Sequence, residues 1–192
     1  MANLPDIDID FADRENALKH FKHIRASRIE NDIRVKHNTG VYMNEVPFDP
    51  MSNLAAVDYK EAEEQGFFKL DFLNVSIYKD VKDETHLQQL MEKEPLWELL
   101  EHDDFNNLVF HVAGHGSILR SMRPRSVEQL AAVLAMIRPA KRYLIGKDWT
   151  TVMMEIWTKP ANGEYYFKKS HAIAYAVSVI VHMNLLCENL TF

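Results

Sequence analysis

Three aspartates, Asp6, Asp8 and Asp10, occupy every second position of the segment 4–11, and the positions that follow each of them are isoleucine or phenylalanine. Strict alternation of polar and apolar residues predicts a half-buried β-strand. Its polar face would carry carboxylates roughly 6.5–7 Å apart. Because like charges in a row repel one another, a hard divalent cation such as Mg²⁺, which takes oxygen ligands, would stabilise this face. The alternative is an acidic edge strand whose charge prevents aggregation.

A second alternating segment, 67–73, places Lys69 and Asp71 on the face opposite to its inward-facing phenylalanine and leucine side chains. If this strand pairs beside the first, Asp71 completes a set with Asp8 and Asp10. Three carboxylates on two neighbouring strands can hold two Mg²⁺ ions about 3.5–4 Å apart, as in the two-metal sites of polymerases. The sequence therefore predicts a two-magnesium site on these strands. For Lys69, a simple surface ion pair with a carboxylate is the alternative to contact with a nucleotide.

Basic residues in the second half of the chain are candidates to bind phosphate. Arg138, Lys141 and Arg142 follow an amphipathic segment that predicts a helix over 127–137, and arginine matches phosphate geometry bidentately. A further group precedes a long apolar segment that predicts a buried helix, and helix N-termini favour anions. Its members are Lys168, Lys169, Ser170 and His171. An ordinary helix cap is the alternative for the serine.

Four segments resemble, in chain order, motifs of the C-family replicative DNA polymerases, the family of the bacterial DNA polymerase III alpha subunit. They are 5–11, 66–73, 108–111 continuing through Arg138-Pro139, and 167–176. The resemblance implies a palm domain with two Mg²⁺ ions. Its catalytic and metal-binding aspartates would correspond to Asp8, Asp10 and Asp71, whereas Asp6 belongs to the motif without holding a metal.

The same resemblance implies a fingers region near the incoming nucleotide. Lys169, Ser170 and His171 correspond to its nucleotide- or DNA-contacting segment, with Lys168 beside them. The chain also departs from the family pattern: residues 110–114 lack the family's acidic residue, and Ala140-Lys141 replaces its Gly-Pro. At 192 residues the chain is far shorter than family members. It is therefore interpreted as a palm-and-fingers remnant, of the kind a compact phage genome would encode, or as one piece of a split polymerase.

The elements that must position these residues suggest an α+β fold. A small mixed sheet would form from the acidic strand, a hairpin and the Asp71 strand, packed by helices in a palm-like region 1–83. A helix-rich, basic, fingers-like region would follow over 84–192. Strands are predicted at 33–36 and 41–43 with a turn at 38–40, and at 108–112. Helices are predicted at 12–27, 75–82, 84–93, 95–101, 118–122, 127–137 and 170–187. Residues 58–65 form either a short acidic helix or a loop, 149–157 is ambiguous and 159–163 is a turn.

The charge is divided unevenly along the chain, whose formal net charge is -6. Residues 1–112 carry 12 Lys and Arg against 23 Asp and Glu, and residues 113–192 carry 10 against 5. An acidic half that could hold metal thus precedes a basic half that could hold phosphate, although ordinary surface charge gives the same pattern. The single cysteine, Cys187, excludes an internal disulfide and fits a reducing cytoplasm. The N-terminus lacks a signal-peptide pattern, and 170–187 is expected to be a buried helix rather than a membrane span.

Two functions of different classes follow from these residues. The first is a Mg²⁺-dependent DNA-directed DNA polymerase, a nucleotidyltransferase that extends a primer on a DNA template with dNTPs. It would act alone or with other polymerase fragments, in the cytoplasm (the host cytoplasm if a phage encodes it), without a membrane partner. The second is a non-catalytic module that mimics part of a polymerase and binds host replication proteins or DNA.

Overall fold

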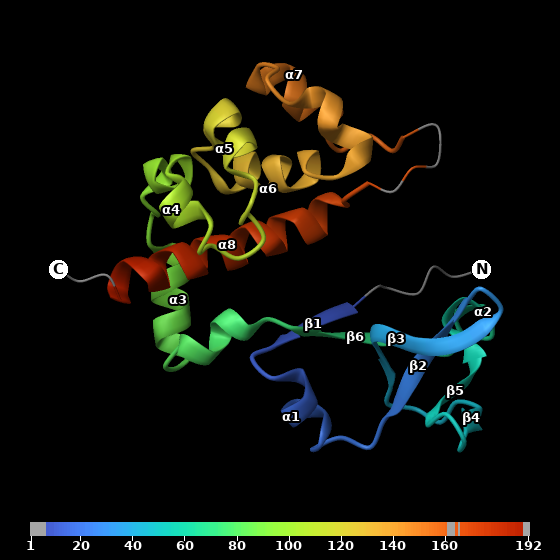
Figure 1. Ribbon diagram of the computed structural model, residues 1–192. Coiled ribbons are helices and arrows are strands. Elements are labelled where there is room, and N and C mark those ends of the chain that lie inside the picture. Colours follow the sequence, from blue (N-terminus) through green and yellow to red (C-terminus); the bar gives the residue numbers. More distant parts are fainter. Residues whose placement is uncertain (1–6, 161–163, 165, 190–192) are drawn as a thin grey trace. The chain divides into compact units, whose positions relative to one another are not determined.

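The computed structural model describes residues 7–160, 164 and 166–189. Asp6, the start of the first predicted strand and most of the predicted turn at 159–163 lie outside this range. The chain divides into two compact units, residues 1–79 and 80–192. The first unit contains a β-sheet with two short helices, and the second is built from helices (Figure 1). Each unit is described by itself below.

A six-stranded mixed sheet forms the framework of the first unit, as the predicted α+β class requires (Figure 1). Its strand order is β1-β6-β3-β2-β5-β4. The pairs β1–β6 and β2–β5 are parallel, whereas β2–β3, β3–β6 and β4–β5 are antiparallel. The strands are β1 (Ile7–Phe11), β2 (Ile24–Glu30), β3 (Ile33–Tyr42), β4 (Phe48–Asp49), β5 (Leu54–Asp58) and β6 (Leu70–Asn74).

Two small apolar clusters hold this sheet. Leu18 of helix α1 (Arg14–Leu18) packs with Val41 and Phe72. A second cluster around Tyr42 includes Ala62 of helix α2 (Tyr59–Glu64). Of the two alternatives expected for 58–65, a helix or a loop, the structure has the helix α2. The Asp58 side chain caps its N-terminus by accepting from the Lys60 N–H.

The helix predicted over 12–27 is wrong. Helix α1 begins after the cap residue Asp13 but ends at Leu18, and strand β2 starts at Ile24. Ala26 and Ser27 are buried within the sheet, where β2 pairs with β3 on one side and β5 on the other. Tertiary pairing therefore overrides the apolar spacing that suggested a longer helix.

The turn predicted at 38–40 is also wrong. Strand β3 runs from Ile33 to Tyr42, and the hairpin turn lies earlier, at Asn31 and Asp32. Both residues have positive φ, 49° and 62°, which is typical of the two-residue turns that match the twist of a hairpin. Residues 37–40 instead form a bulge. Arg25 pairs with Val41 and Ser27 pairs with Lys36, so these four residues of β3 stand opposite a single residue of β2.

The second unit is helical, with its apolar core around α6 and α8 (Figure 1). The strand predicted over 108–112 is wrong. Val109 and Val112 are buried among the helices, and the backbone there forms turns in which His111 has a φ of 62°. The elements are η1 (Ser76–Asp80), which joins the two units, α3 (Glu84–Glu92), η2 (Trp97–Glu101), α4 (Asp103–Asn106), α5 (Gly116–Met122), α6 (Val127–Met136), η3 (Pro139–Leu144), α7 (Trp149–Glu155) and α8 (Lys169–Asn189).

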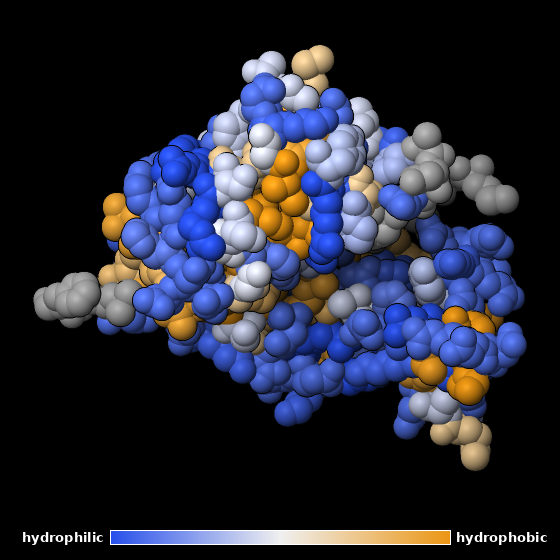
Figure 2. All heavy atoms as spheres, turned by 45° about the horizontal axis from the view of Figure 1, so that its top comes forward, coloured by the Kyte–Doolittle hydropathy of each residue, from blue (hydrophilic) through white to orange (hydrophobic). Residues whose placement is uncertain are grey.

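Helix α8 is long and apolar enough to cross a membrane by length and composition alone, and half of its most apolar window is buried. It packs against α6 and α3, and Asn184 near its C-terminal end donates to two backbone oxygens at the end of α3. The face drawn in Figure 2 is largely hydrophilic. These features are those of a core helix and are compatible with a soluble protein.

Candidate functional site

Parallel pairing of β1 with β6 places the predicted aspartates on one face of the sheet. Asp8 lies opposite Asp71 in the register, and Asp10 follows two residues along the same strand. Asp8 and Asp10 are exposed, whereas Asp71 is only 8% exposed. Although the residue as a whole is exposed, surrounding protein atoms partly desolvate the Asp10 carboxyl group. This desolvation, and then the charge of Asp8, raise the pKa of Asp10, and a hydrogen bond from Tyr78 opposes the shift. The edge of this face therefore carries two neighbouring carboxylates on one strand.

The Asp71 carboxylate is held by two neighbouring side chains. The Thr39 hydroxyl donates to Oδ1 at 2.5 Å, and the Lys69 ammonium forms an ion pair with Oδ2. Lys69 immediately precedes β6 and lies two residues before Asp71. It forms an ion pair with a carboxylate, as the alternative for this lysine supposed, but the pair is largely buried rather than on the surface. Thr39 was missed, because it was assigned to a turn rather than to a strand beside β6.

The bulge in β3 brings His37 and Thr39 to this carboxylate. The backbone N–H groups of Gly40 and Thr39 donate to His37 Nδ1, at 2.9 and 3.4 Å. That nitrogen lies 3.8 Å from Asp71 Oδ1 and acts as an acceptor. Burial and the Lys69 charge lower the pKa of His37, so its imidazole is neutral at pH 7. Bulges commonly re-aim side chains in this way beside functional sites.

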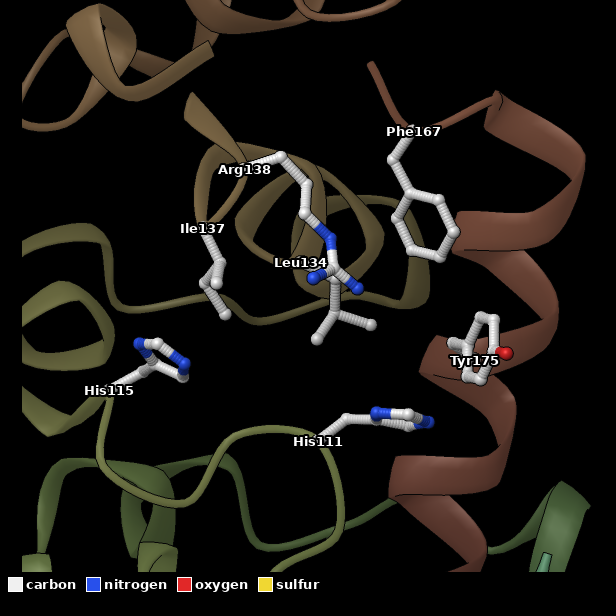
Figure 3. Close-up of a pocket in the computed structure, with 7 residues that line it drawn as sticks. All are labelled: His111, His115, Leu134, Ile137, Arg138, Phe167 and Tyr175. Atoms are coloured by element: carbon white, nitrogen blue, oxygen red, sulfur yellow. The ribbon is translucent and has the colours of Figure 1, made fainter. Parts of the chain in front are cut away.

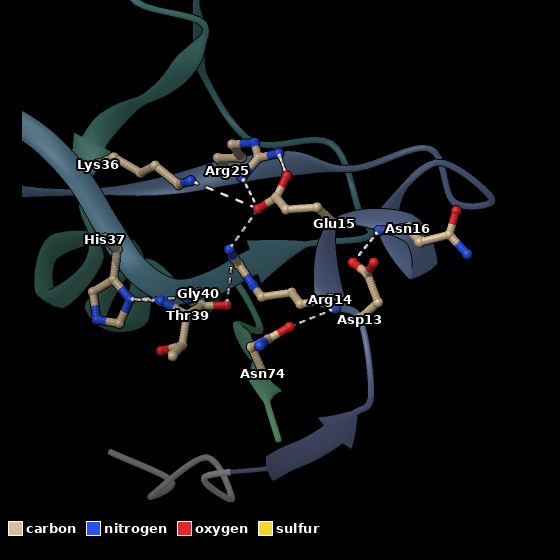
Figure 4. Close-up of polar contacts among 10 residues, drawn as sticks. All are labelled: Asp13, Arg14, Glu15, Asn16, Arg25, Lys36, His37, Thr39, Gly40 and Asn74. Atoms are coloured by element: carbon tan, nitrogen blue, oxygen red, sulfur yellow. Dashed lines mark hydrogen bonds and ion pairs between the residues drawn. The ribbon is translucent and has the colours of Figure 1, made fainter. Parts of the chain in front are cut away.

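Arg14 braces the bulge from helix α1. Its guanidinium donates to the Thr39 carbonyl at 3.2 Å, and its backbone N–H donates to Asn74 Oδ1 at 3.0 Å (Figure 4). Glu15 bonds Arg14 at 3.0 Å and Arg25 at 2.6 Å. These contacts link β6, the bulge and α1, and they fix the backbone that carries Thr39.

The three aspartates offer only oxygen donors, which is the chemistry that Mg²⁺ prefers. As folded, however, residues 7–160, 164 and 166–189 contain no group of three His, Cys, Asp or Glu side chains gathered closely enough to hold a metal ion. The Lys69 ammonium forms an ion pair with one oxygen of Asp71. The donor set thus fits a hard divalent cation in kind, on the condition that Lys69 moves off Asp71.

The helical unit contains a pocket of about 100 Å³. Arg138, at the end of α6, directs its guanidinium into the space between the rings of this pocket (Figure 3). The guanidinium carbon lies 5.4 Å from the centre of the Phe167 ring, which is a cation–π contact. The pocket is lined by His111, His115, Leu134, Ile137, Arg138, Phe167 and Tyr175.

Two imidazoles accompany this arginine. Burial against the pocket wall and the charge of Arg138 lower the pKa of His111 to about 4, so His111 is neutral at pH 7. Its ring contacts Tyr175 edge-on at a centroid distance of 4.3 Å. A cation, the neutral imidazole of His111 and aromatic rings suit a small anion attached to a flat group. His111, His115 and Tyr175 were not among the predicted site residues, because nothing local in the sequence links them to Arg138.

The remaining predicted residues are distributed around the helical unit. Lys141 is buried, and its ammonium donates to the Glu155 carbonyl at 2.7 Å and to the Thr158 hydroxyl at 3.0 Å, so it ties down the end of α7. Arg142 is exposed and donates to the Ile137 carbonyl at 3.2 Å. The start of α8 carries the four others: Lys168, Lys169 and Ser170 are exposed, and His171 is partly buried.

No protein-family model matches this chain, and none of the curated proteins compared with it matches. The function is therefore argued from the residues and their geometry.

Proposed function

We propose that this chain is a polymerase-like nucleotidyltransferase, which transfers a nucleotide to a primer 3′-hydroxyl on a DNA template. The observation that carries the proposal is the register of the two parallel strands. Asp8 stands opposite Asp71, and Asp10 shares their face. Three carboxylates on neighbouring strands are the donor set of a two-metal site. The four segments that resemble C-family DNA polymerases point in the same direction.

Under this proposal each part of the carboxylate face has a task. Asp8, Asp10 and Asp71 would hold Mg²⁺, with Thr39 fixing the orientation of Asp71. Two bound ions would supply an activated primer hydroxyl and charge stabilisation for the departing pyrophosphate.

The helical unit would supply the cations for the nucleotide and the template. Arg138 is directed into its own pocket, and Arg142 is exposed nearby along the chain. Lys168, Lys169, Ser170 and His171 at the start of α8 would contact nucleotide or DNA. Lys141 is the exception among the predicted residues, because its ammonium already holds protein oxygens.

The proposed partners are primed DNA and dNTPs, together with other polymerase fragments or replication proteins if the enzyme is split. A single, partly buried cysteine fits a reducing cytoplasm, which is the host cytoplasm if a phage encodes the chain.

Primer extension with Mg²⁺ and four dNTPs tests this function. Asp8→Asn is the informative variant, because Asp8 is exposed and its replacement leaves the packing of the sheet intact. Asp32→Asn in the hairpin turn is the matched control, since it removes the same charge away from the carboxylate face. Extension by the wild type and the control, lost in Asp8→Asn, supports the proposal. Extension that survives Asp8→Asn contradicts it.

A second candidate function is a non-catalytic module that binds replication proteins or DNA. It is favoured by the occupancy of Asp71, whose two oxygens already bond Thr39 and Lys69. This function predicts no extension under any condition. It also predicts capture of a replication protein or of primed DNA with equal affinity by wild type and Asp8→Asn. Failure of both ligands to bind would contradict it.

A further inference from the structure

The side chain of Lys69 is built into the sheet rather than spread over its surface. Only 17% of the lysine side chain and 11% of the Asp71 side chain are exposed. Gly40 makes room for it: a Cβ at that position would lie 2.8 Å from Lys69 Cδ and 2.9 Å from Ala26 Cβ and from His37 Nδ1. The absence of a side chain at Gly40 therefore leaves room for the Lys69 side chain to reach Asp71.

The charges around Asp71 show why the ammonium lies there. His37 turns an acceptor nitrogen, Nδ1, towards the backbone N–H groups of Thr39 and Gly40. The Arg14 guanidinium bonds Glu15 and the Thr39 carbonyl. Lys69 is thus the cation in direct contact with Asp71. A buried carboxylate without a partner is costly, and an adjacent ammonium offsets part of that cost. Asp8 and Asp10, by contrast, lie together on the exposed part of the face.

We propose that Lys69 is the internal counter-ion of Asp71 and occupies the place of a divalent cation, so that a cation binds the full carboxylate face only by displacing Lys69. This inference rests on the proposed function, because it concerns the same metal site. It explains what holds the Asp71 carboxylate in its orientation when no divalent ion is bound. Thr39 holds Oδ1 during the exchange, and the exchange takes place at Oδ2.

The direct test is a titration of the whole chain with Mn²⁺ alone, with free Mn²⁺ measured by electron paramagnetic resonance. An opposite charge in contact with a carboxylate weakens its affinity for a proton by about 10- to 1000-fold. The Lys69 ammonium should weaken the affinity of Asp71 for a divalent cation in the same way. We therefore expect Lys69→Met to bind Mn²⁺ at least roughly tenfold more tightly than the wild type. Lys22→Met, which removes the same charge from an exposed position, should stay within about twofold of the wild type.

Two further variants keep the test decisive. Lys69→Gln retains an N–H donor for Asp71 but removes the charge, so it should fold even if Lys69→Met does not. Circular dichroism of both variants checks their folding. Adding Asp8→Asn to Lys69→Met should remove the gained affinity, which locates the ion at these strands. Equal or weaker Mn²⁺ binding by the folded Lys69 variants would overturn the inference.

The outcomes also separate this inference from the proposed function. Equal Mn²⁺ binding by wild type and Lys69 variants overturns the counter-ion role and leaves the metal site standing. Tighter binding by the Lys69 variants, together with no primer extension, supports the counter-ion role and counts against the polymerase function. Absence of Mn²⁺ binding in every variant overturns both.

Discussion

The two units of this chain use buried polar groups for different purposes. In the helical unit, Asn184 donates to the carbonyls of Leu90 and Lys93 at 2.9 Å, and buried Lys141 binds the carbonyl at the end of α7. These side chains tie helix ends inside a large apolar core. In the sheet unit, the apolar clusters are small, and buried Asp71 bonds a side-chain cation and a hydroxyl. These two side chains of the helical unit thus bond backbone carbonyls, whereas Asp71 of the sheet unit bonds the charged and polar side chains of a candidate site.

This difference indicates where substitutions should affect stability and where they should affect chemistry. Loss of apolar volume should matter most in the helical unit, whose core is continuous. Loss of charge should matter most in the sheet unit, because the buried carboxylate of Asp71 forms its ion pair with Lys69 there. The predictions below test this contrast, from the largest expected effect to the smallest.

Leu130→Ala should lower the free energy of unfolding by about 2–5 kcal/mol, because it leaves a cavity at a fully buried position of α6. Chemical denaturation checks this value. Leu108→Ala is the matched control, since Leu108 is 58% exposed, and it should change stability by less than about 0.5 kcal/mol. An equally small effect of both substitutions would show that the helical core does not carry the stability of its unit.

Asp71→Asn should destabilise the protein by about 1–3 kcal/mol, because it leaves the partly buried Lys69 ammonium without its charged partner. The double variant Lys69→Met/Asp71→Asn should lose less stability than the sum of the two single changes. Denaturant unfolding of the four proteins forms the thermodynamic cycle. If the stability losses of the two single variants simply added up in the double variant, Lys69 and Asp71 would have no coupling energy. The contrast drawn between the two units would then be wrong.

Arg138→Met should weaken binding of a deoxynucleoside triphosphate by roughly tenfold while changing stability little, because the arginine is exposed at its pocket and bonds to a charged ligand are worth about 1.5–3 kcal/mol. Titration followed by intrinsic fluorescence measures the affinity. Lys147→Met removes an equal charge from the surface of the same unit and should leave binding unchanged. If both variants lost affinity for the nucleotide equally, the effect would come from the overall charge of the unit and not from the Arg138 pocket.

Asp10→Asn should raise Tm at pH 7 by roughly 1–3 °C, a small shift because the residue is exposed. The folded-state pKa of Asp10 is raised, so its ionisation opposes folding at neutral pH, and acidification relieves that cost. The advantage of the asparagine variant should therefore vanish as the pH falls below about 4. Thermal melts from pH 7 to pH 3 measure it. An advantage that persists at pH 3 would rule out charge as the cause.

Glu15→Gln should show the opposite pH dependence with the smallest effect. Hydrogen bonding to Arg25 lowers the pKa of Glu15 to about 2, so the ionised carboxylate stabilises the fold above the ordinary pKa and loses this contribution as the pH falls towards 2. Because Glu15 is exposed, the cost at pH 7 should stay below about 1 kcal/mol. Melts at pH 7 and pH 2.5 should show a clearly smaller difference at the lower pH. An equal difference at both would contradict the ion-pair explanation.

Much of the framework followed from local sequence patterns. Alternation predicted the strands that became β1 and β6, and helical spacing predicted α6 and the buried helix α8. Period and composition act over a few residues, so they can be read without the fold. The three aspartates were accordingly expected on one face, provided that the two strands paired. Their role as metal ligands remains a prediction.

Tertiary structure alone decided the surroundings of those aspartates. Thr39 and His37 reach Asp71 through a bulge that exists only because β3 and β2 pair with a shifted register, and a register is a long-range property. The same holds for β2, whose segment has helical spacing but pairs with β3 on one side and with β5 on the other. The pocket joins His111, Arg138 and Tyr175 from distant parts of the chain. The sequence by itself determined which faces carry charge, because side-chain order along a strand or helix is local. The fold decided which charges meet, because that depends on pairing and packing between segments far apart in the chain.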